Sequence, residues 1–123
     1  MLLKGFYKLV STTKIDTVNS IVRVQLQKDH PIFKGHFPEN PITPGVCMIQ
    51  IIKEITQIHT DSTLFLESIS NVKFTAIINP FENPELLLEM QILEEDNTFK
   101  VKNLTKFENG VIALKCNGIF IKK

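Results

Sequence analysis

Cysteine is scarce in this chain of 123 residues, which contains only Cys47 and Cys116. Two cysteines are too few for a disulfide scaffold, and their spacing matches neither a CxxC zinc site nor a thiol-redox motif. We therefore expect two buried thiols, and we regard a nucleophilic Cys47 in the first turn of a helix as the less favoured alternative. The sequence implies no metal and no redox cofactor.

Long apolar runs and an excess of one charge sign are also absent. No apolar run approaches the roughly 18–20 residues that a membrane-spanning helix needs, and the N-terminal segment, with Lys4, lacks the pattern of a signal peptide. We expect a cytoplasmic protein with no membrane span. The formal net charge is +1 and the lysines are scattered, which argues against a nucleic-acid partner. With 43% hydrophobic and 22% charged residues, residues 1–123 are predicted to form one globular domain.

The first half of the chain predicts a strand, a rigid loop and a buried helix. Apolar and polar residues alternate over residues 20–28, which is typical of a strand with one buried face. The prolines and glycine of residues 31–44 predict a shaped loop without helix or strand. A helix is predicted from Gly45 to about His59, with Thr43 as a candidate N-cap. Its apolar surface extends nearly all round, so we expect it to be buried.

The second half of the chain is rich in predicted strands. They cover residues 64–67, 71–78, 86–92, 99–103 and 111–121, and hairpin turns are expected at Asp96–Asn97 and Asn109–Gly110. The fold class is therefore α+β, with a long, curved antiparallel sheet wrapped around one central helix. Such a sheet leaves an unpaired edge strand, and pairing with a second copy of the chain is a common solution. We expect a dimer.

One histidine, His36, lies between Gly35 and Phe37 and is followed nine residues later by the predicted helix start at Gly45. An imidazole titrates near neutral pH and can remove a proton. The free amides of Gly45 and Val46 can stabilise a developing negative charge, helped by the helix dipole. A thioester carbonyl bound there would acquire an acidic α-proton, which is the first half of the dehydration of a 3-hydroxyacyl thioester. The second half requires an acid for the leaving hydroxyl.

Residues 30–50, HPIFKGHFPENPITPGVCMIQ, resemble the signature GHFPxxPxxPGV of the 3-hydroxyacyl-(acyl carrier protein) dehydratases, which have the hot-dog fold. The match covers about a sixth of the chain, and the later segment NVKFTAIINP is similar to the family in order and spacing. The resemblance implies that His36 is the catalytic histidine and that the Gly45 amide binds the thioester carbonyl. It also implies that the histidine and a carboxylate from the neighbouring protomer meet across a dimer interface.

The sequence departs from this pattern where the family has its catalytic carboxylate, because this chain has Gln50 there. A glutamine amide forms hydrogen bonds but cannot act as a carboxylic acid. Glu54 lies one helical turn further on, roughly 6 Å along the same helix face, and the family often has glutamine at that position. Gln50 and Glu54 therefore look exchanged, and Glu54 is either a relocated acid or a polar residue at the end of the buried face.

Three functions remain open at this point. The first is a dehydratase acting on 3-hydroxyacyl chains carried by acyl carrier protein or coenzyme A, in fatty acid or polyene-type biosynthesis. The second is a non-catalytic acyl-thioester-binding subunit that pairs with an active dehydratase, as a mixed dimer rather than a homodimer. The third is a thioesterase of the same fold, for which Glu54 is the nearby carboxylate.

Other residues have simpler interpretations. His30 is expected to be a loop or capping residue and His59 the end of the helix. Exposed lysines or the single arginine, Arg23, could contact an acidic carrier protein. Core and acyl-tunnel positions are expected for four phenylalanines, Phe33, Phe37, Phe74 and Phe81.

Overall fold

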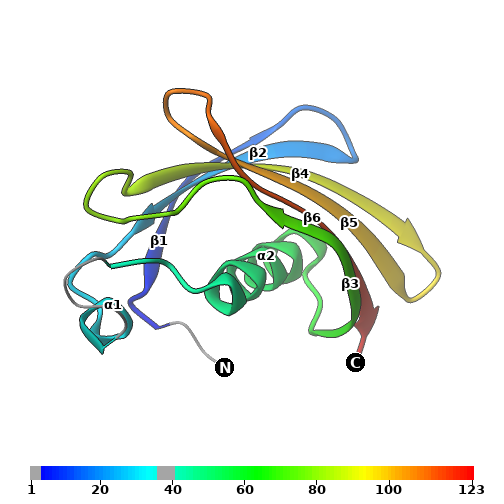
Figure 1. Ribbon diagram of the computed structural model, residues 1–123. Helices are drawn as coiled ribbons and strands as arrows, with labels where there is room; N and C mark the ends of the chain where they lie inside the picture. Colours follow the sequence, from blue (N-terminus) through cyan, green and yellow to red (C-terminus); the bar gives the residue numbers. More distant parts are fainter. Residues whose placement is uncertain (1–3, 36–40) are drawn as a thin grey trace.

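The computed structural model describes residues 4–35 and 41–123. Six antiparallel strands form one sheet that curls around a long helix, α2 (Figure 1). The elements in chain order are β1 (Tyr7–Lys14), β2 (Asn19–Leu26), α1 (Pro31–Gly35), α2 (Gly45–Thr60), β3 (Leu64–Phe74), β4 (Glu85–Glu95), β5 (Thr98–Phe107) and β6 (Ile112–Lys122). The expected α+β architecture is confirmed. The strand order β1-β2-β4-β5-β6-β3 leaves β1 and β3 at the two edges of the sheet.

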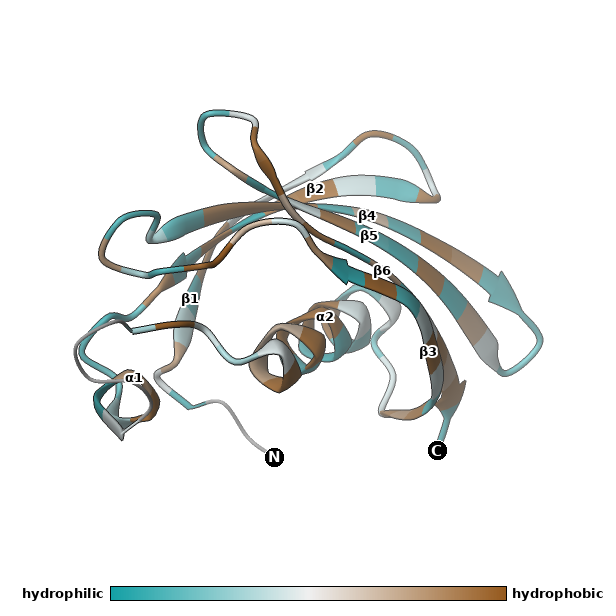
Figure 2. Ribbon diagram, in the orientation of Figure 1, coloured by the Kyte–Doolittle hydropathy of each residue, from teal (hydrophilic) through white to brown (hydrophobic). Residues whose placement is uncertain are grey.

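The core lies between the inner face of the sheet and α2. Hydrophilic and hydrophobic residues alternate along β4, β5 and β6 (Figure 2), as expected for strands with one face buried. The buried side chains of α2 include Met48, Ile51 and Ile55, and they face inward-pointing residues such as Leu88 and Phe120. Among the residues that the structure describes, no helix is long and apolar enough to span a membrane.

Strand β3 is continuous, whereas the sequence predicted two strands with a break at residues 68–70. Its pairing with β6 shifts register between Leu66 and Ser68 and again between Ser70 and Lys73. Asn71 has a left-handed backbone with φ of 53°, which asparagine tolerates better than most residues. These bulges interrupt the period of two along the chain, and therefore the sequence pattern breaks although the strand does not.

Strand β1 was missed in the sequence, and the short helix α1 contradicts the predicted helix-free loop. All but one of the β1 residues are exposed, so the strand has no buried face that could produce alternation. Helix α1 begins at Pro31, a position where the missing amide of proline costs nothing. His30 caps it, because its Nδ1 accepts a hydrogen bond of 3.1 Å from the Ile32 amide. Phe33 is buried and stacks on the ring of Phe6.

Candidate functional site

The site predicted from the sequence is centred on the first turn of α2. Pro44, not Thr43, is the N-cap residue, and no side chain caps the helix. Thr43 instead donates its backbone amide to the carbonyl oxygen of Ile78 at 2.8 Å. This bond fixes the loop before the helix, and it makes the predicted capping role of Thr43 wrong.

Two amides at this helix start have no acceptor within residues 4–35 and 41–123. The amides of Cys47 and Met48 donate to the Pro44 carbonyl oxygen, at 3.0 and 3.3 Å, whereas those of Gly45 and Val46 do not. The Val46 side chain is exposed. The helix dipole adds partial positive charge at this end. The geometry thus offers adjacent N–H donors suited to a carbonyl oxygen that becomes negatively charged.

Phe74, at the end of β3, packs against this helix start. A Cβ atom placed on Gly45 would lie 3.1 Å from both Cε2 and Cζ of the Phe74 ring, so glycine is what lets the ring approach. The phenylalanines were expected in the core or lining a tunnel, and of the three that the structure describes only Phe33 has a core position. Phe33 is buried, Phe74 is 43% exposed, and Phe81 is 57% exposed in the isolated chain.

His36 and Phe37, the predicted catalytic histidine and its neighbour, lie outside the described residues. Their assignment remains a prediction from the sequence motif. The other predicted site residues, Gly45, Val46, Gln50 and Glu54, all lie on α2, within its first three turns.

Gln50 and Glu54 contact each other, and a tyrosine joins them. Nε2 of Gln50 donates a hydrogen bond of 3.0 Å to Oε2 of Glu54, and the hydroxyl of Tyr7 donates one of 2.8 Å to Oε1 of the same carboxylate. Tyr7 is the single tyrosine of the chain. It lies on β1, 47 residues before Glu54, so neither motif nor spacing in the sequence relates the two.

The hydroxyl of Tyr7 is held in its protonated form. Burial raises its pKa, and the hydrogen bond to Glu54 and the negative charge of that carboxylate raise it further. Tyr7 is therefore a donor to Glu54 throughout the neutral range. The two cysteines are buried, as predicted. Burial raises the pKa of the Cys47 thiol and raises that of Cys116 to about 11, which disfavours the alternative of a nucleophilic Cys47.

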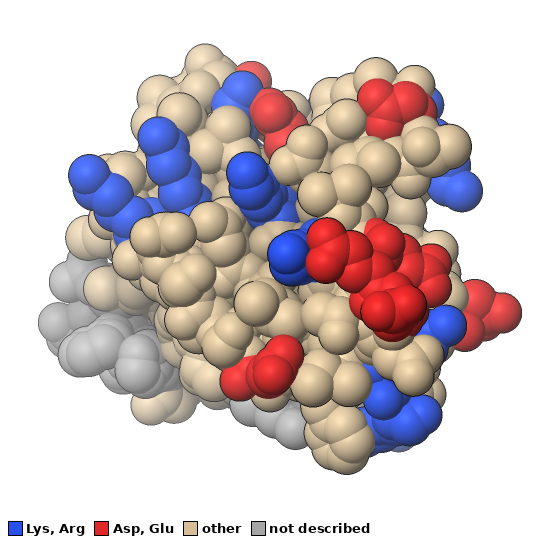
Figure 3. Space-filling model, turned by 90° about the vertical axis from the view of Figure 1, so that its right-hand side faces the viewer, with Lys and Arg blue, Asp and Glu red and all other residues tan. Residues whose placement is uncertain are grey.

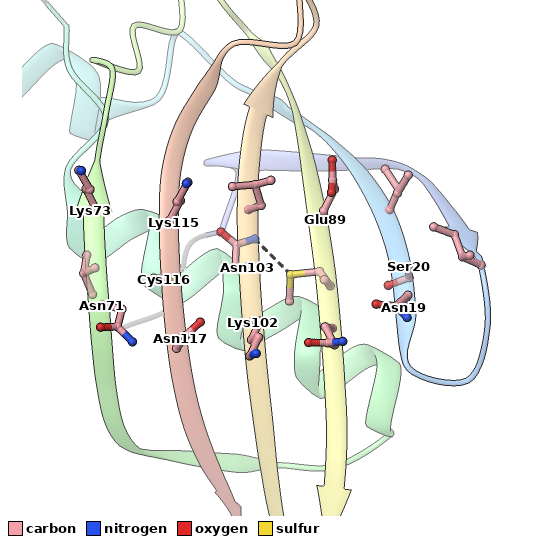
Figure 4. Close-up of a pocket in the computed structure, with 16 residues that line it drawn as sticks. Asn19, Ser20, Asn71, Lys73, Glu89, Lys102, Asn103, Lys115, Cys116 and Asn117 are labelled. Atoms are coloured by element: carbon pink, nitrogen blue, oxygen red, sulfur yellow. Dashed lines mark hydrogen bonds between the residues drawn. The ribbon is translucent and has the colours of Figure 1, made fainter.

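A second concave surface lies on the face of the sheet turned away from α2 (Figure 4). This outer groove has a volume of about 920 Å³. Two rows of side chains in cross-strand register form its floor. One row consists of Asn19, Gln91, Lys102 and Asn117, and the other of Ile21, Glu89, Leu104, Lys115 and Lys73.

The outer groove carries a net positive charge. Glu89 pairs with Lys106 at 2.6 Å, whereas Lys73, Lys102 and Lys115 form no ion pair with any described residue. Lys73 and Lys115 are direct cross-strand neighbours on β3 and β6 (Figure 4), an arrangement that is unfavourable without a counter-charge. Figure 3 shows the side of the molecule at the right of Figure 1, where several basic side chains gather at the upper left and acidic side chains gather near the centre, with further basic side chains among and below them. This surface could not be predicted from the sequence, because the three lysines come together only through the register of β3, β5 and β6.

Comparison with known proteins agrees with the fold. The family model ApeI-like (ApeI dehydratase) matches residues 12–112. The 3-hydroxyacyl-(acyl-carrier-protein) dehydratase FabZ of Lactobacillus helveticus is 29% identical over 121 residues, covering 89% of this chain and 81% of the relative. FabZ of Rickettsia massiliae is 34% identical over 109 residues, covering 81% and 74%.

Among solved structures, the dehydratase heterocomplex ApeI:P of Xenorhabdus doucetiae contains a chain that superposes with a TM-score of 0.76. The two chains are 20% identical, and the match covers 94% of this chain and 97% of that one. At this identity the structural likeness establishes the hot-dog fold. The family match spans most of the chain, including the helix start, Gln50 and Glu54, and the protein therefore belongs to the ApeI-like dehydratase family.

Proposed function

We propose that the chain is a dehydratase that converts 3-hydroxyacyl thioesters to trans-2-enoyl thioesters, in fatty acid or polyene-type biosynthesis. The observation that carries the proposal is the pair of amides at Gly45 and Val46, which have no acceptor among the described residues and lie beside the Phe74 ring on the same helix as Gln50. These donors suit the carbonyl oxygen of a thioester whose α-proton is being removed. Membership of the dehydratase family supports this use.

The reaction can proceed with a single acid–base group. The imidazole of His36 takes the proton from C2 while the amides of Gly45 and Val46 stabilise the negative charge on the thioester oxygen. The C3–O bond then breaks, the imidazolium returns the same proton to the departing hydroxyl, and water leaves with a double bond formed between C2 and C3. No net proton is gained or lost, so Gln50 need not supply one and can instead hydrogen-bond the hydroxyl.

A second candidate is a non-catalytic acyl-thioester-binding subunit that pairs with an active dehydratase. Two points favour it: the sequence resemblance puts Gln50 where the family has its carboxylate, and the structurally similar ApeI:P protein is a dehydratase heterocomplex. In this case His36 would face a carboxylate that a different hot-dog subunit provides.

The partner chain would pair along β3. This edge strand is 11 residues long and exposes Phe65, Leu66, Val72 and Phe74. Unpaired backbone groups and apolar side chains on an edge strand favour strand addition. A homodimer is the simplest assembly, and pairing with another hot-dog subunit uses the same edge.

The carrier would dock on the outer groove. An acyl carrier protein with an acidic surface complements Lys73, Lys102 and Lys115, which form no ion pair with any described residue. Lys73 precedes Phe74, whose ring touches Gly45, so the groove and the start of α2 lie on opposite faces of the sheet beside the same end of β3. Coenzyme A, with its phosphates, is the alternative carrier.

A single assay separates the enzyme from the binding subunit. The purified chain is supplied with 3-hydroxyacyl and trans-2-enoyl thioesters, and their interconversion is followed for the wild type, His36→Ala, Gln50→Glu and Glu54→Gln. For an enzyme we expect wild-type activity that His36→Ala reduces at least about 100-fold, the usual contribution of a general acid–base group. A silent wild type that becomes active on mixing with a second hot-dog subunit supports the binding subunit instead.

A further inference from the structure

Glu54 connects two elements that are distant in the sequence. Its carboxylate accepts one hydrogen bond at each oxygen, from Tyr7 on β1 at Oε1 and from Gln50 on α2 at Oε2. The backbone of each donor belongs to a regular element. Tyr7 follows the fully buried Phe6 and pairs with Leu26 across the sheet, and Gln50 lies in the second turn of α2.

This contact decides which way the amide of Gln50 faces. The oxygen and nitrogen of a glutamine amide are interchangeable in shape, so only their partners define the orientation. A carboxylate offers acceptors alone. Gln50 must therefore turn Nε2 toward Glu54 and Oε1 away from it, and Oε1 forms no hydrogen bond within the part of the chain that the structure describes.

We infer that Tyr7 and Glu54 are positioning residues that lock the Gln50 amide with its carbonyl oxygen outward, where it accepts the hydrogen bond of the substrate's 3-hydroxyl group. The inference rests on the proposed dehydration. It assigns a role to the exchanged order of glutamine and glutamate: the carboxylate has moved behind the amide, and the amide contacts the substrate as an acceptor. Glu54 orients a neighbour and is not the relocated acid.

Tyr7 keeps the carboxylate in place. Its hydroxyl stays protonated because burial and the adjacent negative charge both disfavour the phenolate, so it donates to Oε1 and leaves Oε2 for Gln50. Without this bond the Glu54 side chain could turn into the adjoining surface depression of about 510 Å³, which is lined by Tyr7, Glu54, Gln57 and Ile58 among others. The Gln50 amide would then be free to flip, and in the flipped state it would present a donor where the substrate needs an acceptor.

A purely structural tether between β1 and α2 is the competing explanation, and Gln57 provides a matched control for it. Gln57 lies one turn after Glu54, and its Oε1 accepts a hydrogen bond of 2.9 Å from the Leu64 amide. It therefore ties α2 to β3 much as Glu54 ties α2 to β1. Gln57 has no contact with Gln50 or Tyr7 among the hydrogen bonds of the described residues.

The first test measures kcat, KM and thermal unfolding for Tyr7→Phe, Glu54→Gln and Gln57→Met. We expect Tyr7→Phe and Glu54→Gln each to lower kcat about five- to tenfold, the size of one lost hydrogen bond. KM should change less than kcat, because only the orientation of Gln50 is affected. We expect Gln57→Met to lower the unfolding temperature about as much as Tyr7→Phe and Glu54→Gln do, and to leave kcat unchanged.

The second test exchanges the amide of Gln50 and the carboxylate of Glu54. Gln50→Glu alone puts two carboxylates within hydrogen-bonding distance, so the pKa of one rises and the pH–rate profile gains a titration step. Combining Gln50→Glu with Glu54→Gln preserves each hydrogen bond: Tyr7 donates to the introduced amide oxygen, and the introduced amide nitrogen donates to the new carboxylate. We expect the extra step to disappear in the double variant and activity to reach at least the wild-type level.

Three outcomes would overturn the inference. If Tyr7→Phe and Glu54→Gln both keep the wild-type kcat, the hydrogen bonds among Tyr7, Glu54 and Gln50 only tie β1 to α2. A loss of 100-fold or more in Glu54→Gln, with the double variant equally inactive, would make Glu54 the acid. An inactive wild type, alone and with a second hot-dog subunit, would remove the proposed function and the inference together, whereas the first two outcomes leave the dehydratase proposal standing.

Discussion

Gly45 serves two purposes that require the absence of a side chain. Its amide is one of the two at the start of α2 that have no acceptor among residues 4–35 and 41–123, and the ring of Phe74 packs where a side chain at this position would lie. In Gly45→Ala the new methyl group would lie 3.1 Å from two ring carbons, so the ring must move. It can do so, because it is 43% exposed.

We expect Gly45→Ala to affect activity more than stability. Alanine favours a helix by up to about 1 kcal/mol, and crowding costs about 1–3 kcal/mol in a packed site, so the free energy of unfolding should fall by only about 1 kcal/mol. The displaced ring would remain beside the start of α2, where the thioester is proposed to bind, and KM for the thioester should rise. Kinetics and thermal unfolding measure the two effects. Adding Phe74→Leu should restore KM, and a KM that remains high would mean that the ring is not the cause.

The residues of the site differ in how visible they are in the sequence. Gly45, Val46, Gln50 and Glu54 belong to one helix, and helical spacing is enough to place them on it. Tyr7 was not predicted, because its contact with Glu54 depends on how β1 lies against α2 and no local pattern encodes that packing. The lysines of the outer groove were described as scattered for the same reason: they come from three strands whose register is set by tertiary pairing.

At the scale of elements, the strands with a buried face were predicted from the sequence more completely than the exposed edge strands. Strands β2, β4, β5 and β6 bury alternate residues, and the sequence pattern placed each of them. The edge strand β1 exposes nearly all of its residues, and β3 bulges at Asn71, so neither shows a regular period. Little of the stability of an edge strand comes from a buried face, so β1 was missed and β3 was predicted as two separate strands.

The exposed β3 edge predicts how the chain associates. We expect the wild type to sediment at twice the chain mass of 14.0 kDa, with Leu66 and Val72 partly buried between copies. Each large apolar side chain that is buried contributes about 1.5–3 kcal/mol. Leu66→Lys combined with Val72→Lys should therefore weaken association more than 100-fold, roughly 3 kcal/mol or more, and analytical ultracentrifugation should then show monomers.

Strand β1 supplies the control for this experiment. Leu9 and Val10 lie on the opposite edge of the sheet and are 41% and 44% exposed, close to the 40% of Leu66 and of Val72. Leu9→Lys combined with Val10→Lys should leave the dimer intact. If the β1 variant dissociates and the β3 variant stays dimeric, the interface lies on β1 and its assignment to β3 is wrong.

At the scale of the whole molecule, the charge of the outer groove predicts how substrate is delivered. We expect neutralising Lys73, Lys102 and Lys115 to glutamine to raise KM about tenfold for an acyl chain on acyl carrier protein, since exposed ion pairs contribute up to about 1 kcal/mol each. KM for the same chain on free pantetheine should not change. Added salt should weaken carrier binding to the wild type more than to the variant.

Lys100 provides the matched control for the groove. It lies on β5 two residues from Lys102 and on the same face, but it pairs with Glu95 at 3.4 Å. Lys100→Gln should leave both KM values unchanged. An equal rise for the carrier and pantetheine substrates would show that the three lysines act on the site itself, and a rise limited to coenzyme A thioesters would assign the groove to that carrier.

The order of strands in the sheet ties the two ends of the chain together. Strand β2 is hydrogen-bonded to β4, and β3 to β6. In both pairs, one strand precedes the segment between β3 and β4 in the chain and the other strand follows it. A cut there would leave each fragment with a strand whose neighbour is on the other fragment. The N-terminal and C-terminal strands should therefore fold cooperatively because of the strand pairing alone, without any contribution from contacts with the helix.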